Sequence, residues 1–109
     1  MRKLMAMLGM LAASAVLGAA GNTYRLVKEI QIGGEGGWDY VIVDASTHRA
    51  YVSHATKIIV ADTETGQIVG EIPDTPGVHG FAIASDLGRG FTSNGRASTS
   101  TIVDSSRRT

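Results

Sequence analysis

The chain contains no cysteine and only two prolines among its 109 residues. Without cysteine no disulfide can hold the fold together, so stability has to come from packing. Basic residues are not in excess either, because ten Lys and Arg face ten Asp and Glu. A nucleic-acid-binding surface needs a basic patch that replaces the counterions of the phosphates, so we expect no nucleic-acid partner.

The first twenty residues follow the three-part pattern of a secretory signal peptide. Arg2 and Lys3 form a positive start, residues 4–17 form an apolar run, and small residues occupy 18–20. We expect residues 1–20 to be cleaved, leaving a periplasmic or secreted protein with eight basic and ten acidic residues, a net charge of −2. The alternative is an uncleaved anchor, although a span of seventeen residues is at the short limit for a bilayer. Apart from this segment we expect no contact with a membrane.

From residue 21 onwards, short apolar segments alternate with turn residues. Polar and apolar residues alternate over 24–32, and the continuous apolar run at 40–43 is typical of a strand buried on both faces. Further strands are expected at 49–53, 57–61 and 67–72. No window of twelve residues in this part has a helical period, so the sequence predicts an all-β fold.

The chain repeats itself at a spacing of 40 residues. A shift of 40 aligns Arg49–His54 with Arg89–Asn94, whereas Ile59–Asp62 aligns with Thr101–Asp104 only at a spacing of 42. We therefore expect two extra residues in the second hairpin, where Asn94-Gly95 has the composition of a type I′ turn. A period of about 40 with four short strands per repeat is typical of a β-propeller blade.

Two segments carry a resemblance to a known family. Tyr51-Val52-Ser53-His54 and Phe91-Thr92-Ser93-Asn94 resemble the Tyr-Val-Thr-Asn signature of YVTN-type β-propeller repeats in YncE-like exported proteins. Residues 80–89 resemble the family's inner strand and the turn that follows it. The resemblance covers roughly residues 24–104.

The resemblance implies a partial β-propeller of about two four-stranded antiparallel blades, the second incomplete. It places an outer closing strand at 24–32, one blade at 37–72 and an incomplete blade at 78–104. Since closed propellers have typically 4–8 blades, residues 21–109 are expected to be an N-terminal fragment of a longer propeller. The alternative is a complete small β-sandwich.

Missing neighbouring blades would leave apolar surface uncovered. We expect Val60, Ile68 and Ile72 to face water on the sides where further blades belong. Residues 99–103 should form an open edge strand with unpaired backbone groups, which promotes association with other chains.

The candidate ligand site follows from the repeat. Asp39 and His79 are equivalent at the 40-residue spacing, each just before the innermost strand of its blade. In a propeller these positions lie at the mouth of the central channel. Trp38 precedes Asp39, and an aromatic beside an acid suits a polar or cationic group, although Trp38 packing between blades is the alternative. We predict a ligand-binding site at Trp38, Asp39 and His79 for an unknown small molecule or protein.

Other chemistry is less well supported by the sequence. His48 and His54 flank one strand at a separation of about 20 Å, given ~3.3 Å per residue, which is too far for one metal ion. The three histidines are therefore expected at the surface. The glycine run 33–37 lacks the lysine ending and the following helix of a phosphate loop. No Gly-x-Ser-x-Gly motif occurs, so we predict no catalytic residue, no metal and no cofactor.

Two functions remain open from the sequence. The leading hypothesis is an exported, non-catalytic binding or scaffold propeller. The alternative is a fragment of a propeller enzyme, lactonase-like or a cofactor-dependent oxidoreductase, whose site needs acids and metal ligands from several further blades.

Overall fold

The computed structural model describes residue 21 and residues 23–105. This part of the chain contains seven strands and one short 3-10 helix. They are β1 (Trp38–Asp44), β2 (Arg49–His54), β3 (Lys57–Asp62), β4 (Ile68–Ile72), β5 (Val78–Ala84), η1 (Ser85–Leu87), β6 (Arg89–Asn94) and β7 (Ile102–Asp104). The expected signal peptide at 1–20 lies outside the described residues, among which no helix is long and apolar enough to span a membrane.

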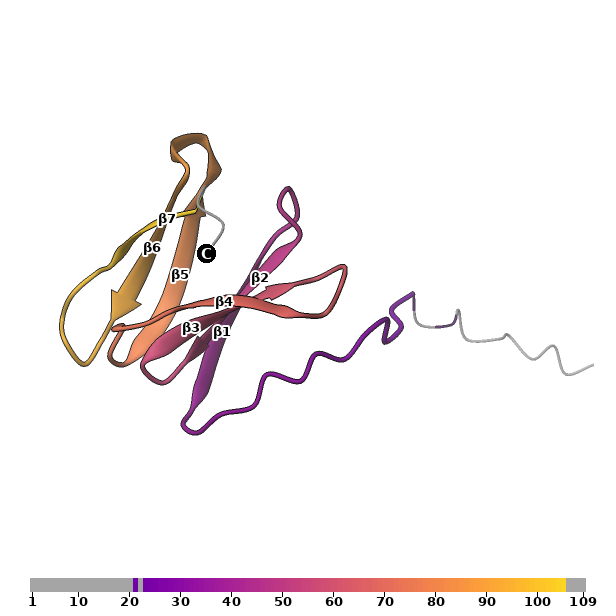
Figure 1. The fold of residues 1–109 in the computed structure, drawn as a ribbon, viewed down its shortest axis with the longest axis horizontal. Helices are drawn as coiled ribbons and strands as arrows, with labels where there is room; N and C mark the ends of the chain where they lie inside the picture. Colours follow the sequence, from indigo (N-terminus) through magenta and orange to yellow (C-terminus); the bar gives the residue numbers. More distant parts are fainter. Residues whose placement is uncertain (1–20, 22, 106–109) are drawn as a thin grey trace, which may run out of the picture.

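The strands form two antiparallel sheets, which confirms the all-β class. Strands β1 to β4 follow one another in sheet A, and β5 to β7 follow one another in sheet B. Figure 1 shows the two sheets next to each other, with the segment before β1 passing along sheet A and continuing beyond it. The four strands predicted at 40–43, 49–53, 57–61 and 67–72 correspond to β1 to β4.

The repeat in the sequence is present in the pairing of the strands. Val41 pairs with Val52 in sheet A, and Phe81 pairs with Thr92 in sheet B, which is a shift of 40 in both strands. Both first strands also have a register shift just before this pair. The third strand of sheet B follows two residues later than that of sheet A, so the two extra residues lie in the β6–β7 connection as expected.

The turn in this connection differs from the prediction. A type I′ turn at Asn94-Gly95 requires positive φ at both residues, and neither of them has it. Instead the backbones of Asn94 and Thr99 exchange two hydrogen bonds around a four-residue turn, in which Ser98 takes a φ of 52°. Asn94 stays in the strand because its buried side-chain amide donates to the hydroxyls of Thr99 and Thr101.

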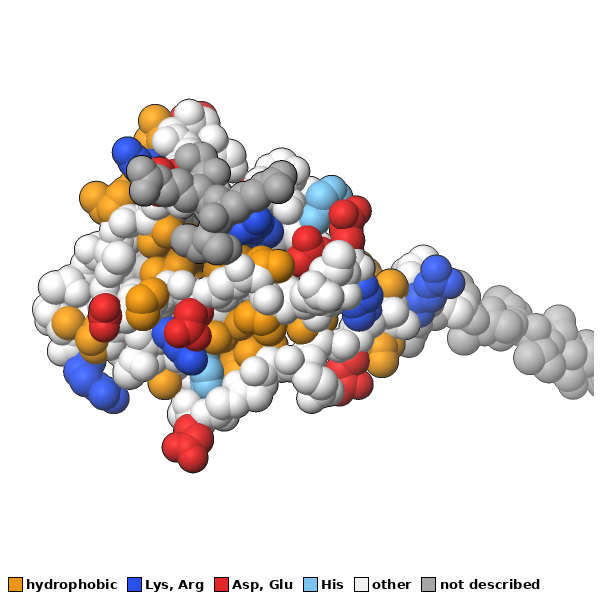
Figure 2. Space-filling view, in the orientation of Figure 1, with side chains coloured by type: hydrophobic (Ala, Val, Ile, Leu, Met, Phe, Trp, Pro, Cys, Tyr) orange, Lys and Arg blue, Asp and Glu red, His pale blue; other side chains and the backbone are white. Residues whose placement is uncertain are grey.

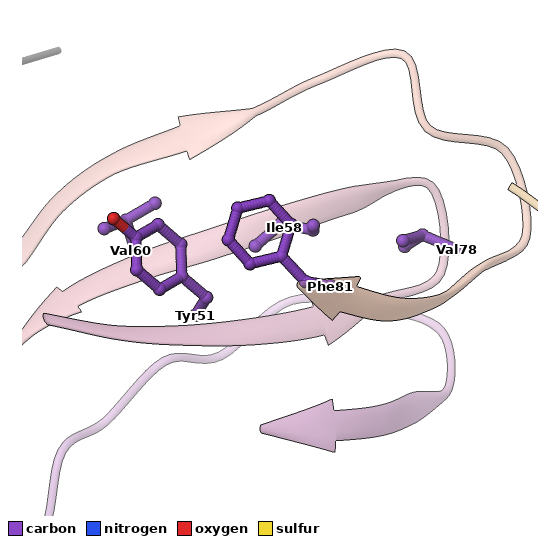
Figure 3. Close-up of a cluster of buried hydrophobic side chains, with 5 residues drawn as sticks. All are labelled: Tyr51, Ile58, Val60, Val78 and Phe81. Atoms are coloured by element: carbon purple, nitrogen blue, oxygen red, sulfur yellow. The ribbon is translucent and has the colours of Figure 1, made fainter. Parts of the chain in front are cut away.

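The hydrophobic core lies between the two sheets. It consists of Tyr51 from β2, Ile58 and Val60 from β3, and Val78 and Phe81 from β5, all of them buried. Figure 3 shows these side chains in the space between the strands. The rings of Tyr51 and Phe81 are 4.7 Å apart between centroids. Burying a side chain such as Phe81 contributes about 1.5–3 kcal/mol, so this cluster holds the two sheets together.

Burial differs from the expectation on both sides of sheet A. Val60 is buried and Ile72 packs against the same core, because sheet B covers this face; only Ile68 is exposed as expected. Conversely, Val41 and Val43 were expected to be buried and are exposed. No described segment covers the outer side of β1, where these two side chains lie.

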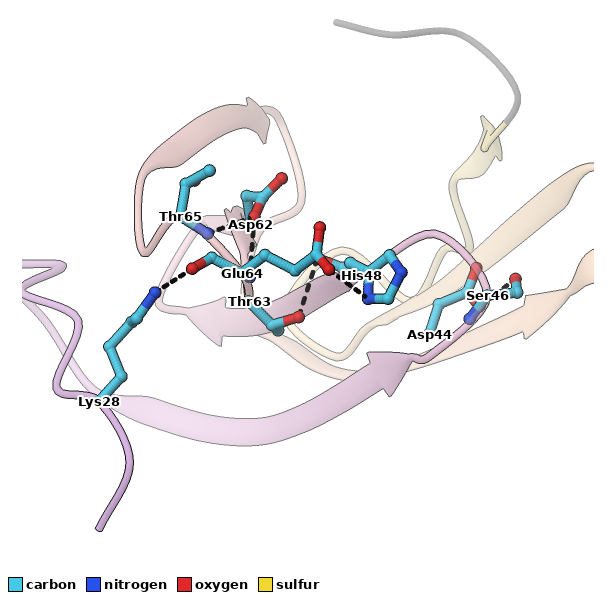
Figure 4. Close-up of polar contacts among 8 residues, drawn as sticks. All are labelled: Lys28, Asp44, Ser46, His48, Asp62, Thr63, Glu64 and Thr65. Atoms are coloured by element: carbon cyan, nitrogen blue, oxygen red, sulfur yellow. Dashed lines mark hydrogen bonds and ion pairs between the residues drawn. The ribbon is translucent and has the colours of Figure 1, made fainter.

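Residues 24–32 do not form the expected outer strand. Alternation of polar and apolar residues suits a strand, but a strand also needs a partner for its backbone groups, and none of the described strands pairs with this segment. The segment instead follows sheet A. The ammonium of Lys28 donates to the carbonyl of Glu64 in the β3–β4 turn (Figure 4). Gly34 lies against His54 at the other end of the sheet.

Two aspartates organise the turns at one end of sheet A (Figure 4). Oδ1 of Asp62 accepts the backbone N–H groups of Glu64 at 2.9 Å and Thr65 at 2.8 Å. Oδ1 of Asp44 accepts the hydroxyl of Ser46 at 2.6 Å and its N–H at 3.0 Å. These bonds favour the ionised carboxylates and lower both pKa values, that of Asp62 mainly through the Thr65 backbone and that of Asp44 mainly through the Ser46 hydroxyl.

The β1–β2 turn ends on a residue in the left-handed conformation. His48 has a φ of 55°, and the equivalent residue in sheet B is Gly88, with a φ of 61°. This conformation costs a residue with a Cβ roughly 1–2 kcal/mol, whereas glycine adopts it freely. At this turn, sheet A therefore carries local backbone strain that sheet B avoids.

Candidate functional site

Asp39 and His79 meet at one end of the two sheets. Each is the second residue of the first strand of its sheet and lies within the register shift that the sheets share, so the predicted equivalence of the two positions is confirmed. Nδ1 of His79 donates a hydrogen bond to Oδ2 of Asp39, and the contact becomes an ion pair when the imidazole is protonated. Packing of the sheets thus joins two residues that are 40 positions apart in the chain.

Trp38 stands next to this pair and stacks on His54. The ring centroids are 3.6 Å apart and the planes differ by 7°. One face of the indole is therefore used in packing, while the side chain as a whole is still 49% exposed. An indole fixed in this way keeps its other face available for a ligand, and aromatic faces attract cations.

His54 is buried, whereas we expected it at the surface. Its side chain is 1% exposed, and its Nδ1 donates to the carbonyl of Gly37 at 3.1 Å. In the neutral imidazole this leaves Nε2 as an acceptor, and that atom has no hydrogen-bond partner among the described residues. His48 and His79 have exposed side chains, as expected.

The glycine run 33–37 covers His54 and explains its burial. A Cβ at Gly34 would lie 2.8 Å from Nε2 of His54, and a Cβ at Gly36 would lie 2.6 Å from Cβ of Ala55. Both glycines also have positive φ. The run therefore serves close packing of the chain on the β2–β3 turn, and it leads into strand β1 and not into a helix.

A hollow of about 380 Å³ opens beside the Asp39–His79 pair. It is lined by Gly36, Gly37, Trp38, Asp39, Ala55, Gly77, Val78, His79 and Arg96. All three predicted site residues therefore line one hollow. The side chains of His79 and Asp39 are 62% and 38% exposed, so a molecule in the hollow can reach them.

Sequence reasoning missed two residues at this site. Arg96, from the β6–β7 turn, adds a cation to the lining, and His54 supports Trp38 from behind. No sequence pattern marks Arg96, because its place depends on how the second hairpin folds back on β5. For His54 the sequence did contain a signal. The glycines at 34 and 36 permit the backbone to pack closely against the end of β2, and such packing buries a histidine at that position.

The described residues contain no group of three or more His, Cys, Asp or Glu side chains that could hold a metal ion. His48 and His54 lie at opposite ends of β2, one just before the strand and one at its last residue. No protein-family model, curated protein or solved structure matches this chain. Its function is therefore inferred from the site and the repeat alone.

Proposed function

We propose that this chain belongs to an exported, non-catalytic binding protein of the YVTN-type β-propeller class and that sheets A and B are successive blades. The strand order of sheet A, in which each strand pairs with the next, is that of a propeller blade. The same register recurs in sheet B. The YVTN-like segments 51–54 and 91–94 form equivalent second strands, which also supports the proposal.

The observation that carries the binding function is the meeting of Asp39 and His79 between the two sheets, with Trp38 beside them. In a propeller, equivalent residues at the start of each inner strand face a common mouth, where a ligand can touch several blades. Strand ends supported by hydrogen-bonded sheets hold such side chains in fixed positions, which suits recognition.

The side chains of the hollow indicate the chemistry of the ligand. Asp39 and the free face of Trp38 suit a cationic group, and the guanidinium of Arg96 suits a carboxylate. We therefore propose a small ligand that carries a cationic group, with an anionic group as a second point of contact. Because the site is half exposed, water screens these charges and the binding is weak.

Trp38 is the only tryptophan in the sequence, so its fluorescence reports on the site directly. The purified chain is titrated with glycine betaine, with tetramethylammonium as a cation-only probe and acetate as an anion-only probe. We expect a saturable change with glycine betaine and a weaker one with tetramethylammonium. Removing the charge with Asp39→Asn should weaken binding by up to about fivefold, because an ion pair at a partly exposed site contributes about 0.2–1 kcal/mol.

Asp86→Asn is the matched control, because it removes an exposed carboxylate in η1, outside the lining of the hollow. It should leave the titration unchanged. If none of the three probes gives a saturable change, or if Asp39→Asn and Asp86→Asn behave alike, the proposed site is wrong.

A further inference from the structure

The two sheets pack head to tail, with different faces in contact. In sheet A, the row Ile42–Tyr51–Val60 runs across three paired strands and faces sheet B; we call this side of a sheet its front face. Sheet B meets it with the opposite side, its back face, which carries Phe81 and Ile83. The contact therefore joins the front face of one repeat to the back face of the next.

The equivalent faces, the front face of sheet B and the back face of sheet A, are exposed on the outside of the molecule. In sheet B, the front-face row is Ala82–Phe91–Ile102, and Ile102 is 67% exposed although its equivalent Val60 is buried. In sheet A, the back face carries Val41 and Val43, equivalent to the covered Phe81 and Ile83, and both valines are exposed. Each uncovered face is thus the repeat of a face that is buried in the internal contact.

The front face of sheet B also has the other features that the internal contact uses. The hydroxyl of Ser53 donates to the carbonyl of His79 across the sheets at 2.6 Å. Its equivalent Ser93 is exposed on sheet B, and the residue equivalent to His79 is Asp39 on sheet A. A shallow hollow of about 290 Å³ beside Ser93 is lined by Ala82 and Phe91, where an apolar side chain can enter. In Figure 2, hydrophobic side chains reach the surface on the side of the molecule where sheet B lies.

We propose that a second copy of this chain docks the back face of its sheet A onto the front face of sheet B. The second copy would place Val41 against Phe91 as Phe81 lies against Tyr51. Val43 would join this contact as Ile83 packs against the internal core. Ser93 would donate to the carbonyl of Asp39 in the second copy. The contact is heterologous, because each copy uses the back face of sheet A toward one neighbour and the front face of sheet B toward the other. Repeating the contact therefore closes a ring or builds an open array.

The segment before β1 leaves this contact accessible. It lies against the β3–β4 turn at Gly66 and against His54, and on the back face beneath it Val52 and Ile59 are buried. It therefore covers the β2–β3 part of the back face. In the internal contact it is β5, the equivalent of β1, that packs against β1 and β2 of sheet A. Strand β1, which would make most of the docking contact, is therefore the strand that stays uncovered.

The test is sedimentation velocity of the purified chain over a concentration series. The wild-type chain should associate with increasing concentration. Ile102→Glu, on the front face, and Val43→Glu, on the back face, should each weaken association about tenfold or more, because an unpaired charge is unfavourable in an apolar contact. Leu87→Glu is the matched control: Leu87 is 66% exposed but lies in η1, away from both faces, and this variant should associate like the wild type.

A mixture of the two interface variants distinguishes head-to-tail docking from a symmetric contact. Ile102→Glu keeps an intact back face and Val43→Glu an intact front face, so mixing two monomeric variants should give a dimer and nothing larger. A monomeric wild-type chain, a mixture that stays monomeric, or an effect of Ile102→Glu alone would overturn the proposal. Circular dichroism checks that the variants are folded, and Ile102→Thr and Val43→Thr replace any that are not. Ligand titrations do not enter this test, so its outcome is independent of the proposed function.

Discussion

Gly90 in β6 is the position where a single methyl group should be most damaging. A Cβ built there would lie 2.3 Å from Cζ and 2.8 Å from Cε2 of Phe81, whose ring is buried in the core between the sheets. In sheet A the equivalent residue is Ala50. It lies on the same face of the sheet as Val41, which is the smaller equivalent of Phe81. We therefore predict that Gly90→Ala forces the Phe81 ring out of its place against Tyr51.

The expected magnitude follows from two opposing effects. Overpacking a filled core costs roughly 1–3 kcal/mol, and contacts this short place Gly90→Ala at the upper end. Replacing glycine by alanine also restricts the unfolded chain, which offsets about 0.4–1 kcal/mol. The free energy of unfolding should therefore fall by about 2 kcal/mol. With a urea m-value of about 1–3 kcal/mol/M, the midpoint should move down by roughly 0.7–2 M.

Urea unfolding followed by Trp38 fluorescence measures this effect. Gly37→Ala is the control, since a Cβ there meets nothing within 4 Å and φ is not positive. It should leave stability unchanged or raise it slightly. In a Phe81→Leu background, which removes the ring atoms that clash, Gly90→Ala should lose most of its effect. The reasoning is refuted if Gly90→Ala is as stable as Gly37→Ala, or if Phe81→Leu does not reduce the effect.

Three further predictions concern the backbone, acid stability and the contact between the sheets. His48→Gly removes the strain of the left-handed conformation and should raise the free energy of unfolding by up to about 1 kcal/mol, measured in thermal melts. A lower melting temperature than that of the wild type would show that His48 is not strained. The folded-state pKa values of Asp44 and Asp62 lie below the ordinary value of 3.8, so their stabilising effect is present above that pH and is lost as the pH falls through the folded pKa. When both aspartates are changed to Asn, the free energy of unfolding should therefore depend less on pH in the acid range than it does in the wild type. Parallel curves for the two proteins would show that these aspartates do not contribute to acid stability. Ser53→Ala removes the 2.6 Å bond to the His79 carbonyl and should lower stability by about 1–2 kcal/mol in urea; no change would mean that water replaces the hydroxyl.

Local patterns in the sequence were sufficient for the strands and for the repeat. Short runs of apolar, largely β-branched residues and the turn residues between them place strands β1 to β4, because both depend on neighbouring residues only. The repeat also fixed the equivalence of Asp39 and His79 and the extra residues between β6 and β7. Both follow from the sequence, because two segments of similar sequence form hairpins with the same strand pairing.

Burial was decided by the tertiary structure. Val60 and His54 look like an outward-facing valine and a surface histidine in the sequence, yet sheet B covers the first and the glycine run covers the second. Residues 24–32 have the alternation of a strand and form none, because pairing needs a free strand edge that local sequence does not supply. In the same way, which side of each sheet stays open is fixed by how the repeats stack. A strand's own residues determine its two faces, and only the packing of distant segments determines which face meets water.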